Sequence, residues 1–213
     1  MKLFFLLIRI LGLGFGIGLS GALIPGPLLA FTVKESLAGG ARTGAVIMTG
    51  HIIVEALLML LIYFGFMGFL TNPAVASVIA VLGSVLLFYL SYSLVKQKDV
   101  LSGEPGTKHY NPVAGGILLT ALNPSFPLWW ATVGYNMLGE GMRLGGRAGV
   151  FAVVAGHWLA DVGWYSIVSF AVAKGRDTML KEKVYPVLKT VMAVFMAALG
   201  LYFLFRGFSA ALS

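Results

Sequence analysis

Long apolar stretches separated by short polar connections dominate this chain. A helix that crosses a bilayer needs about 20 consecutive, mostly apolar residues. Stretches of this kind predict six transmembrane helices, at approximately residues 3–33, 45–70, 73–95, 112–138, 150–173 and 184–205. The sequence therefore predicts an all-α polytopic membrane protein. We expect a retained first helix rather than a signal peptide, because Arg9 interrupts its apolar stretch, which continues past signal-peptide length.

The connections between these segments are too short to hold a soluble domain. Residues 71–72 form a predicted tight turn, and residues 174–183 form a charged loop. The longest connection, residues 97–111, divides the chain into two halves of three predicted helices each. We therefore expect one transmembrane domain over residues 1–213. Its predicted parts are repeat one at about 1–96, the loop at 97–111 and repeat two at about 112–213.

Composition agrees with this architecture. Apolar residues make up 59% of the chain, charged residues only 11%, and the mean hydropathy is +0.92. Soluble domains have about half apolar and a quarter charged residues, so these values exclude a soluble globular protein, a disordered one and a nucleic-acid binder. The absence of cysteine excludes disulfides and thiolate metal sites.

The distribution of Lys and Arg predicts the orientation. Of the 15 Lys and Arg residues, ten follow the odd-numbered predicted helices, and five lie on the other side with both termini. Cytoplasmic loops carry the excess of positive charge. We therefore expect a multi-pass protein of a prokaryotic cytoplasmic membrane, with both termini outside.

The two halves carry similar features in the same order. Each has a proline-containing break, then a glycine-rich stretch, then a glycine–histidine pair. In the first half these are Pro25-Gly26-Pro27, residues 39–44 and Gly50-His51; in the second they are Asn123-Pro124-Ser125-Phe126-Pro127, residues 145–149 and Gly156-His157. An odd number of spans per half inverts the second copy relative to the first. Inverted repeats with helix breaks at corresponding positions are typical of secondary transporters.

Prolines inside the first and fourth predicted helices predict breaks. A proline in a helix removes one donor and leaves the carbonyl four residues back without its partner. Pro25 and Pro27 do this in the first segment, and Pro124 and Pro127 in the fourth. In a bilayer such groups need protein, water or ligand as partners. Each break is therefore either a plain kink, satisfied by neighbouring side chains, or part of a substrate site or hinge.

Two acidic residues lie well inside predicted spans, and each has a histidine four residues before it. The pairs are His51 with Glu55 and His157 with Asp161, so each pair shares one helix face. An ionisable group at membrane depth is a candidate functional site. Each pair could carry a coupling proton, hold a cationic substrate group or tie helices together by a hydrogen bond.

The same four side chains could also ligate a divalent metal, because imidazole and carboxylate are common ligands. The spacing is not the His-Glu-x-x-His of zinc peptidases. The sequence alone leaves open whether the two pairs meet in space. We predict no bound metal and no cofactor.

Small and aromatic residues within the spans add two expectations. Gly12, Gly14, Gly16 and Gly18 lie in an apolar span with no preceding strand, so they predict close helix packing rather than a nucleotide loop. A homodimer through this face is one arrangement that the sequence allows. Trp129-Trp130 follows the fourth-segment break, and Trp130 is therefore a candidate to line a substrate path.

With these motifs in hand, the chain resembles the lysine exporter (LysE/RhtB) family of small prokaryotic amino-acid exporters, and its second half resembles the archaeal branch. The similar residues are Pro25-Gly26-Pro27, residues 39–44, Gly50-His51, Asn123-Pro124, residues 129–134 and residues 156–161. Many members have a lysine after Asn-Pro, where this chain has Ser125. The resemblance implies a six-helix exporter of amino acids, driven by proton or cation exchange.

The sequence thus predicts a secondary transporter, and not an enzyme, for basic or small neutral amino acids. Its expected partners are the amino acid, a coupling proton or cation, and the lipid bilayer. The predicted substrate and ion-binding residues are Pro25, Gly26, Pro27, His51, Glu55, Asn123, Pro124, Trp130, His157 and Asp161. A divalent-cation exporter and a membrane-embedded metal-dependent hydrolase are the alternatives.

Overall fold

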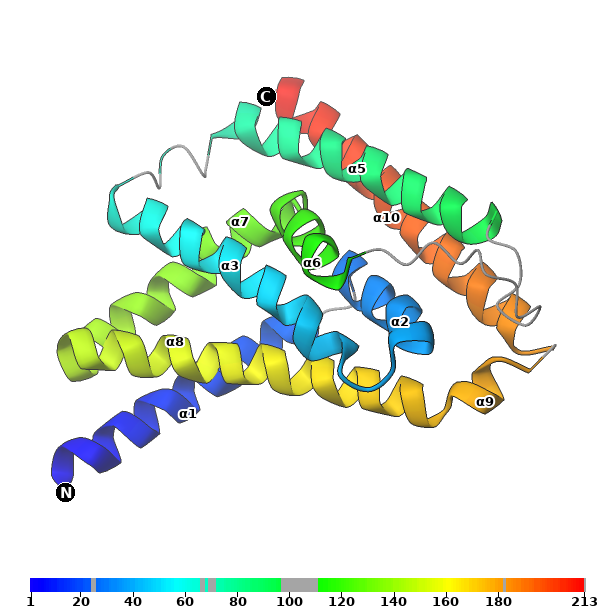
Figure 1. Cartoon of the computed structure of the whole chain (residues 1–213). Coiled ribbons are helices and arrows are strands. Elements are labelled where there is room, and N and C mark those ends of the chain that lie inside the picture. The colour runs from blue at the N-terminus through cyan, green and yellow to red at the C-terminus, as the bar shows by residue number, and fades with distance from the viewer. Residues whose placement is uncertain (24–25, 66–67, 69–71, 97–110, 182, 213) are drawn as a thin grey trace.

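The fold consists of helices of very unequal length (Figure 1). A computed structural model describes the chain except for residues 24–25, 66–67, 69–71, 97–110, 182 and 213. The helices are α1 (Lys2–Ala22), α2 (Pro27–Gly39), α3 (Thr43–Tyr63), α5 (Pro73–Lys96), α6 (Pro112–Ala121), α7 (Ser125–Trp129), α8 (Tyr135–Lys174), α9 (Arg176–Met179) and α10 (Tyr185–Leu212), with a π-helical turn η2 (Trp130–Gly134) before α8.

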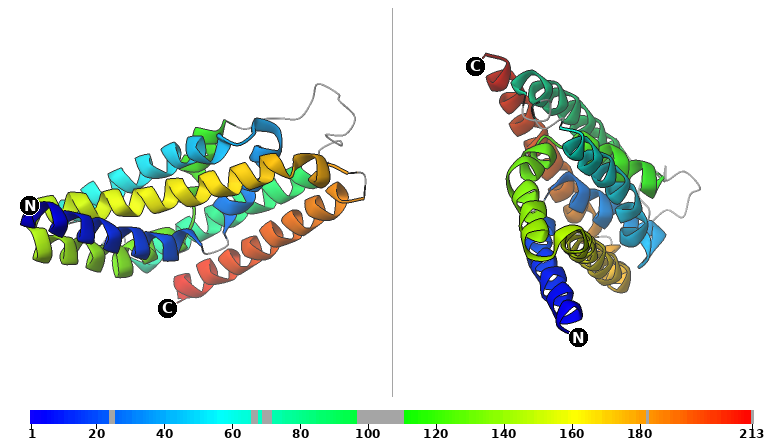
Figure 2. Two further views of the ribbon diagram at one scale, coloured as in Figure 1. Left: turned by 90° about the horizontal axis from the view of Figure 1, so that it is seen from below. Right: turned by 90° about the vertical axis from the view of Figure 1, so that its left-hand side faces the viewer.

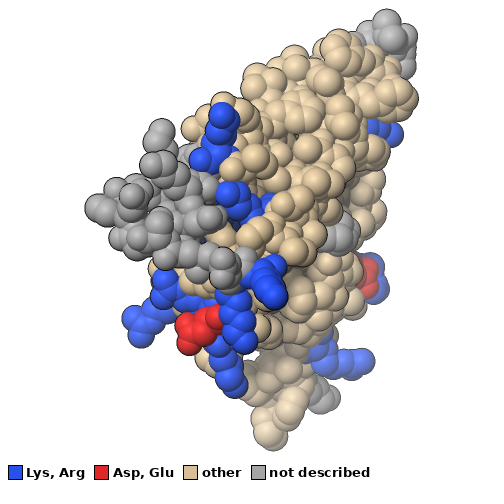
Figure 3. Space-filling model, turned by 90° about the vertical axis from the view of Figure 1, so that its right-hand side faces the viewer, with Lys and Arg blue, Asp and Glu red and all other residues tan. Residues whose placement is uncertain are grey.

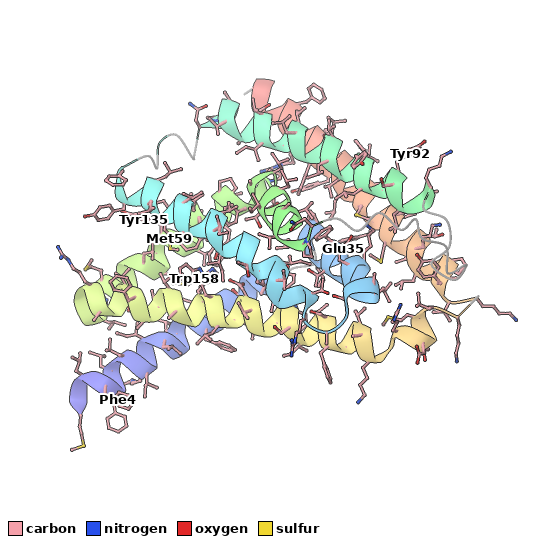
Figure 4. All side chains as sticks on the ribbon, viewed as in Figure 1. Phe4, Glu35, Met59, Tyr92, Tyr135 and Trp158 are labelled. Carbon is pink, nitrogen blue, oxygen red and sulfur yellow. The ribbon has the colours of Figure 1, made fainter. Side chains whose placement is uncertain are left out.

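The described part of the chain contains five helical ranges that are long and apolar enough to cross a membrane. They are Leu3–Ala22, Thr43–Tyr63, Pro73–Lys96, Ser125–Lys174 and Tyr185–Ser209. Large apolar side chains lie exposed along them, including Phe4, which points away from the other helices at the free end of α1 (Figure 4). So much apolar surface is stable in lipid and not in water. The all-helical, polytopic fold class is confirmed.

The first predicted segment is divided into α1 and α2. The former ends at Ala22, and the latter begins at Pro27, with Gly26 extended at its N-cap. Proline is favoured at the first helical position, where its missing N–H is not needed. Pro25 lies outside the described residues.

The fourth predicted segment is also divided. Its first part, α6, ends at Ala121, and α7 begins at Ser125. The side chain of Asn123 accepts a hydrogen bond from the Ser125 backbone N–H (3.1 Å) and so satisfies one of the free donors of the new helix. The sequence did not predict the π-helical turn η2 that follows α7.

A glycine reverses the chain inside α8. Gly146 has φ 59° and ψ −147°, a conformation that only glycine adopts readily. Gly141 and Gly149 would lie about 12 Å apart along a straight helix, but a Cβ on Gly149 would overlap the carbonyl oxygen of Gly141. The two parts of α8 therefore run in opposite directions and contact each other near Gly146. The connection expected between residues 138 and 150 is a tight turn (Figure 1).

Other boundaries differ from the prediction by a few residues. The second segment was expected to end at 70, but α3 ends at Tyr63. The connection at 174–183 contains the short helix α9, and α10 extends beyond the expected end at 205. Residue 71 of the predicted turn and most of the loop at 97–111 lie outside the described residues; Asn72 caps α5 through its side chain (2.9 Å to the Ala74 N–H).

The helices pack in pairs around α2. Helix α1 packs along α8, α3 along α6, and α5 along α10, while α2 contacts α8, α3, α6 and α10. The short helix α2 lies between these pairs (Figure 2), with Phe31, Thr32 and Ser36 almost fully buried. The break before α2 therefore opens into the middle of the molecule.

Basic side chains gather at one end of the bundle. Figure 3 views the end where α2, α5 and α8 finish and α10 begins, and Lys and Arg side chains surround it. The N-terminus of α1 lies at the opposite end (Figure 1).

Candidate functional site

A cavity of about 310 Å³ lies where the two helix breaks meet. Gly26 and Pro27 of the first break and Asn123 and Ser125 of the second line it. The remaining lining residues, mostly aromatic or aliphatic apart from the central ionisable groups, are Gly21, Ala22, Leu28, His51, Glu55, Phe126, Trp129, Trp130, His157, Asp161, Tyr165, Leu199, Tyr202 and Phe203. Ligand sites in proteins typically measure about 300–1,000 Å³, so this cavity matches one small molecule.

The structure brings most of the predicted site residues to this cavity. Those that line it are Gly26, Pro27, His51, Glu55, Asn123, Trp130, His157 and Asp161. Pro124 is the N-cap of α7 and is not among the lining residues. Pro25 lies outside the described residues, so its place relative to the cavity is untested.

The two histidine–carboxylate pairs form one cluster. The Nε2 atoms of His51 and His157 lie 3.2 and 3.0 Å from the same Oε1 of Glu55. They also lie 3.9 and 3.4 Å from Oδ2 of Asp161. Because α3 supplies His51 and Glu55 while α8 supplies His157 and Asp161, the cluster joins the two halves of the chain.

Both carboxylate oxygens of Glu55 accept hydrogen bonds. Its side chain is 1% exposed. The indole N–H of Trp130 donates to Oε1 (3.1 Å), and that of Trp158 donates to Oε2 (2.9 Å). Figure 4 shows Trp158 directed from α8 into the bundle. Since an indole N–H can only donate, these contacts favour the ionised carboxylate, and they satisfy both of its oxygens.

Asp161 differs from Glu55 in its partners. Its side chain is buried (4% exposed), and its Oδ2 has no hydrogen-bond partner among the described residues. The two histidine contacts of this oxygen are within ion-pair distance but lack hydrogen-bond geometry. A buried carboxylate oxygen without a donor is costly, and Asp161 is one of the residues that line the cavity.

The two histidines also differ in their second nitrogen. Nδ1 of His51 shares a hydrogen bond with the Thr120 hydroxyl (2.8 Å). Nδ1 of His157 has no partner among the described residues, and Gly18 faces it instead. The Trp129 ring stacks on His157 at 5.2 Å between centroids. The imidazole of His157 is therefore held by ring contacts with Trp129 and Trp130 and by the contacts of its Nε2.

Several lining residues were not predicted from the sequence. Leu199, Tyr202 and Phe203 come from α10, and Tyr165 comes from α8. Thr120 and Trp158 do not line the cavity, but they form hydrogen bonds with His51 and Glu55, respectively. Apolar residues in an apolar helix carry no signal of a site, so only the pairing of α10 with its neighbours could identify them.

A metal ion could approach part of this cluster. Ligand atoms of His51, Glu55 and Asp161 lie within 4.8 Å of one another. Imidazole and carboxylate suit several divalent ions. However, the two indoles and His157 already direct N–H groups at Glu55, so a metal would have to displace donors from that carboxylate.

Comparisons with known proteins agree with the resemblance seen in the sequence motifs. The YcgF protein of Bacillus subtilis (strain 168), named for amino acid efflux, is 24% identical over 195 residues, which cover 90% of this chain and 93% of that protein. The leucine efflux proteins of Salmonella choleraesuis (strain SC-B67) and Klebsiella pneumoniae (strain ATCC 700721 / MGH 78578) are each 27% identical over 115 residues, about half of each chain. No solved structure matches the chain.

The family comparison covers most of the chain. The sequence profile of the LysE type translocators matches residues 19–207. This range contains both helix breaks, the histidine–carboxylate cluster and the residues of α10 that line the cavity. The chain belongs to the LysE type translocator family.

Proposed function

We propose that this protein is a secondary transporter that exports amino acids across the cytoplasmic membrane, coupled to a proton or cation. The observation that carries the proposal is Asp161, a buried carboxylate that lines a cavity between two helix breaks and has one oxygen without a hydrogen-bond donor among the described residues. Ionisable residues at membrane depth commonly mark substrate and proton pathways. Membership of a translocator family and relatives named for amino acid efflux support the same function and favour a transporter over a membrane-embedded hydrolase.

The two carboxylates have different roles in this proposal. Glu55 is a fixed anion, since Trp130 and Trp158 occupy its oxygens. Asp161 is the exchangeable group, which binds either the ammonium of the substrate or the coupling proton. His51 and His157 contact both carboxylates, and so they couple proton or ammonium binding at Asp161 to the charge of Glu55.

An inverted repeat is part of the proposal, and the helix crossings support it. A Cβ on Gly14 would overlap the carbonyl of Val153, and one on Gly116 would overlap that of Ile47. Each contacted residue lies three positions before a glycine–histidine pair, Gly156-His157 or Gly50-His51. The first helix of each half thus crosses the second helix of the other half through matching residues.

At the same two crossings, the glycines of the second helices contact the first helices at corresponding positions. A Cβ on Gly156 would overlap the carbonyl of Leu11, and one on Gly50 would overlap that of Val113. Leu11 and Val113 each lie three residues before the glycines of the first crossing, Gly14 and Gly116. The third helices of the halves, α5 and α10, pack on each other.

Six membrane crossings follow if α8 counts twice, as its reversal at Gly146 favours. The helical range Ser125–Lys174 has 50 residues, far more than the roughly 20 that one crossing needs. The gathering of basic residues at one end (Figure 3) supports a cytoplasmic position for that end and both termini outside.

Transport in proteoliposomes tests the proposal. We expect labelled amino acids to exchange across vesicles that contain the protein, with a rate that responds to an imposed proton gradient. Asp161→Asn and Glu55→Gln should each abolish exchange in protein that remains folded by circular dichroism. Asp177→Asn is the matched control, because this aspartate is exposed on α9. Wild-type exchange by Asp161→Asn would overturn the proposal.

Export of a divalent cation is the second candidate. The group of His51, Glu55 and Asp161, with ligand atoms within 4.8 Å, favours it. Elemental analysis of the purified protein, before and after equilibration with Zn²⁺ or Mn²⁺, distinguishes the two. Stoichiometric metal that disappears in His51→Ala, together with no exchange of amino acids, would favour the cation.

A further inference from the structure

We infer that the cavity binds an amino-acid zwitterion with a neutral, apolar side chain. Its carboxylate lies at the N-terminus of α2, its ammonium on Asp161, and its side chain against α10. This inference rests on the proposed export function and adds the substrate class and the position of each substrate group.

The N-terminus of α2 is the available carboxylate site. Helix N-termini attract anions through free N–H groups and the positive end of the helix dipole. Helix α2 has 13 residues, and among the described residues no side chain makes a capping hydrogen bond at this end, where the N-cap is Gly26. Pro27 has no N–H, so Leu28 and Leu29 carry the free donors of the first turn. Gly26, Pro27 and Leu28 line the cavity.

The second helix break offers no equivalent position. Asn123 already caps α7 by accepting from the Ser125 N–H (3.1 Å). The side-chain oxygen therefore occupies the place that a substrate carboxylate would take there. Of the two breaks, the one before α2 has no side-chain cap among the described residues.

Asp161 gives an independent indication of a ligand. Asp161 lines the same cavity as the N-terminus of α2, and its buried Oδ2 has no hydrogen-bond partner among the described residues. A primary ammonium has three donors and no acceptor, which is the complement of this oxygen. A helix N-terminus without a side-chain cap and a carboxylate with an oxygen that lacks a hydrogen-bond donor, in one small cavity, together match the two charged groups of a zwitterion.

The remaining charge of the lining excludes a basic side chain. Glu55 and Asp161 are the acidic residues among the described lining residues. The indoles of Trp130 and Trp158 and the two histidines occupy Glu55, and the ammonium would occupy Asp161. A lysine or arginine side chain would then lie buried without a carboxylate partner, which is strongly unfavourable.

The rest of the wall is apolar. From α10, Leu199 and Phe203 line the cavity, and from α7, Phe126 does so. Apolar surface of this kind binds an aliphatic or aromatic side chain by removing both from water. The cavity therefore favours substrates of the size and polarity of leucine, and not the basic class that the sequence left open.

Competition for binding tests the substrate class. The wild-type protein in detergent binds radiolabelled leucine, and unlabelled compounds compete. Norleucine and lysine form a matched pair, because both have an unbranched side chain but only lysine carries a terminal charge. We expect norleucine to compete and lysine to compete at least about tenfold less well, a difference of about 1.4 kcal/mol. Equal or better competition by lysine would overturn the inference.

Two truncated ligands test the position of each charged group. Leucinamide lacks the carboxylate, and 4-methylpentanoate lacks the ammonium; we expect both to compete at least about tenfold less well than leucine. Gly26→Asp supplies a capping carboxylate at the N-terminus of α2. It should weaken leucine binding and leave the weaker competition by leucinamide unchanged. An equal effect of Gly26→Asp on both ligands would overturn the placement at α2.

A variant of the wall tests the side-chain position. Leu199→Ala enlarges the cavity and should shift preference from leucine towards phenylalanine, while Leu201→Ala, on the exposed face of α10, should not. An unchanged preference for leucine over phenylalanine in folded Leu199→Ala protein would show that the substrate side chain does not lie against α10. Exchange of basic but not apolar amino acids in vesicles would overturn this inference and leave the proposed export function intact. Exchange of no amino acid by folded protein would overturn both.

Discussion

His51 and His157 lie on different helices and point at the same oxygen of Glu55, with Nε2–Oε1 distances of 3.2 and 3.0 Å. The histidines of the two halves thus meet at one carboxylate, and each also lies within ion-pair distance of Asp161. The second carboxylate, Asp161, retains an oxygen without a hydrogen-bond donor. Glu55 and Asp161 therefore differ in the number of donors that contact them.

The indole of Trp158 stabilises the charge of Glu55. Trp158→Phe removes the N–H that donates to Oε2 and leaves part of a buried carboxylate without a partner. We expect a loss of about 1–3 kcal/mol in the free energy of unfolding, measured by thermal unfolding in detergent. Trp164→Phe is the matched control, since its buried indole N–H has no partner among the described residues. Equal losses in the two variants would contradict the prediction.

The absence of a side chain at Gly18 positions His157. A Cβ there would lie 2.5 Å from Nδ1 of His157 and 2.9 Å from its Cα, so Gly18→Ala should displace the imidazole from Glu55. We expect a loss of amino-acid exchange of at least about tenfold, since such a shift disturbs a hydrogen bond to a charged group. Gly16→Ala should have no effect, because nothing lies within 4 Å of a Cβ there. Normal exchange by Gly18→Ala would contradict this account.

The crossing of α1 and α8 depends on Gly156. A Cβ at this position would overlap the carbonyl of Leu11, and so Gly156→Ala must separate the two helices. We expect a destabilisation of about 1–3 kcal/mol, the usual range for overpacking, seen as a lower unfolding temperature. Gly163→Ala, on the same helix with open space around it, serves as the comparison. Equal unfolding temperatures of the two variants would show that α1 and α8 do not depend on Gly156 for their close packing.

The Thr120 hydroxyl orients His51. Thr120→Val keeps the shape of the side chain but removes the hydrogen bond to Nδ1 (2.8 Å). We expect slower exchange and a loss of about 1–3 kcal/mol in stability, because a buried imidazole nitrogen loses its partner. Thr132→Val tests whether the effect is local, since that hydroxyl is exposed and bonds only within its own helical segment. Equal behaviour of the two valine variants would argue against an orienting role.

The apolar pattern and the prolines predicted much of the fold. Bilayer-length apolar runs need no tertiary information to be recognised, and so the polytopic helical class is clear from the sequence. The breaks before Pro27 and Ser125 also follow from local chemistry. A connection between the fourth and fifth spans was expected at residues 139–149, but its reduction to a single turn at Gly146 was not, because a helix that resumes after one glycine leaves no long loop to mark it.

The candidate site was predictable where charge or a helix break marks it, as for Glu55 and Asn123. Ionisable residues in apolar spans stand out, and the structure brings His51 and Glu55 together with His157 and Asp161. The roles of Thr120 and Trp158 depend on which helices cross and at what register. No spacing rule within a single helix contains that information.

The pairing of α10 with α5 separates two properties of the cavity. The titratable cluster lies entirely on α3 and α8, whereas Leu199 and Phe203 on α10 form the apolar wall. Because α10 packs along α5 and only lightly on α2, substitutions on α10 can change the shape of the wall while the ion-pair geometry stays intact. In the proposed transporter, the residues that select the amino acid can therefore change without altering the residues that bind the ion.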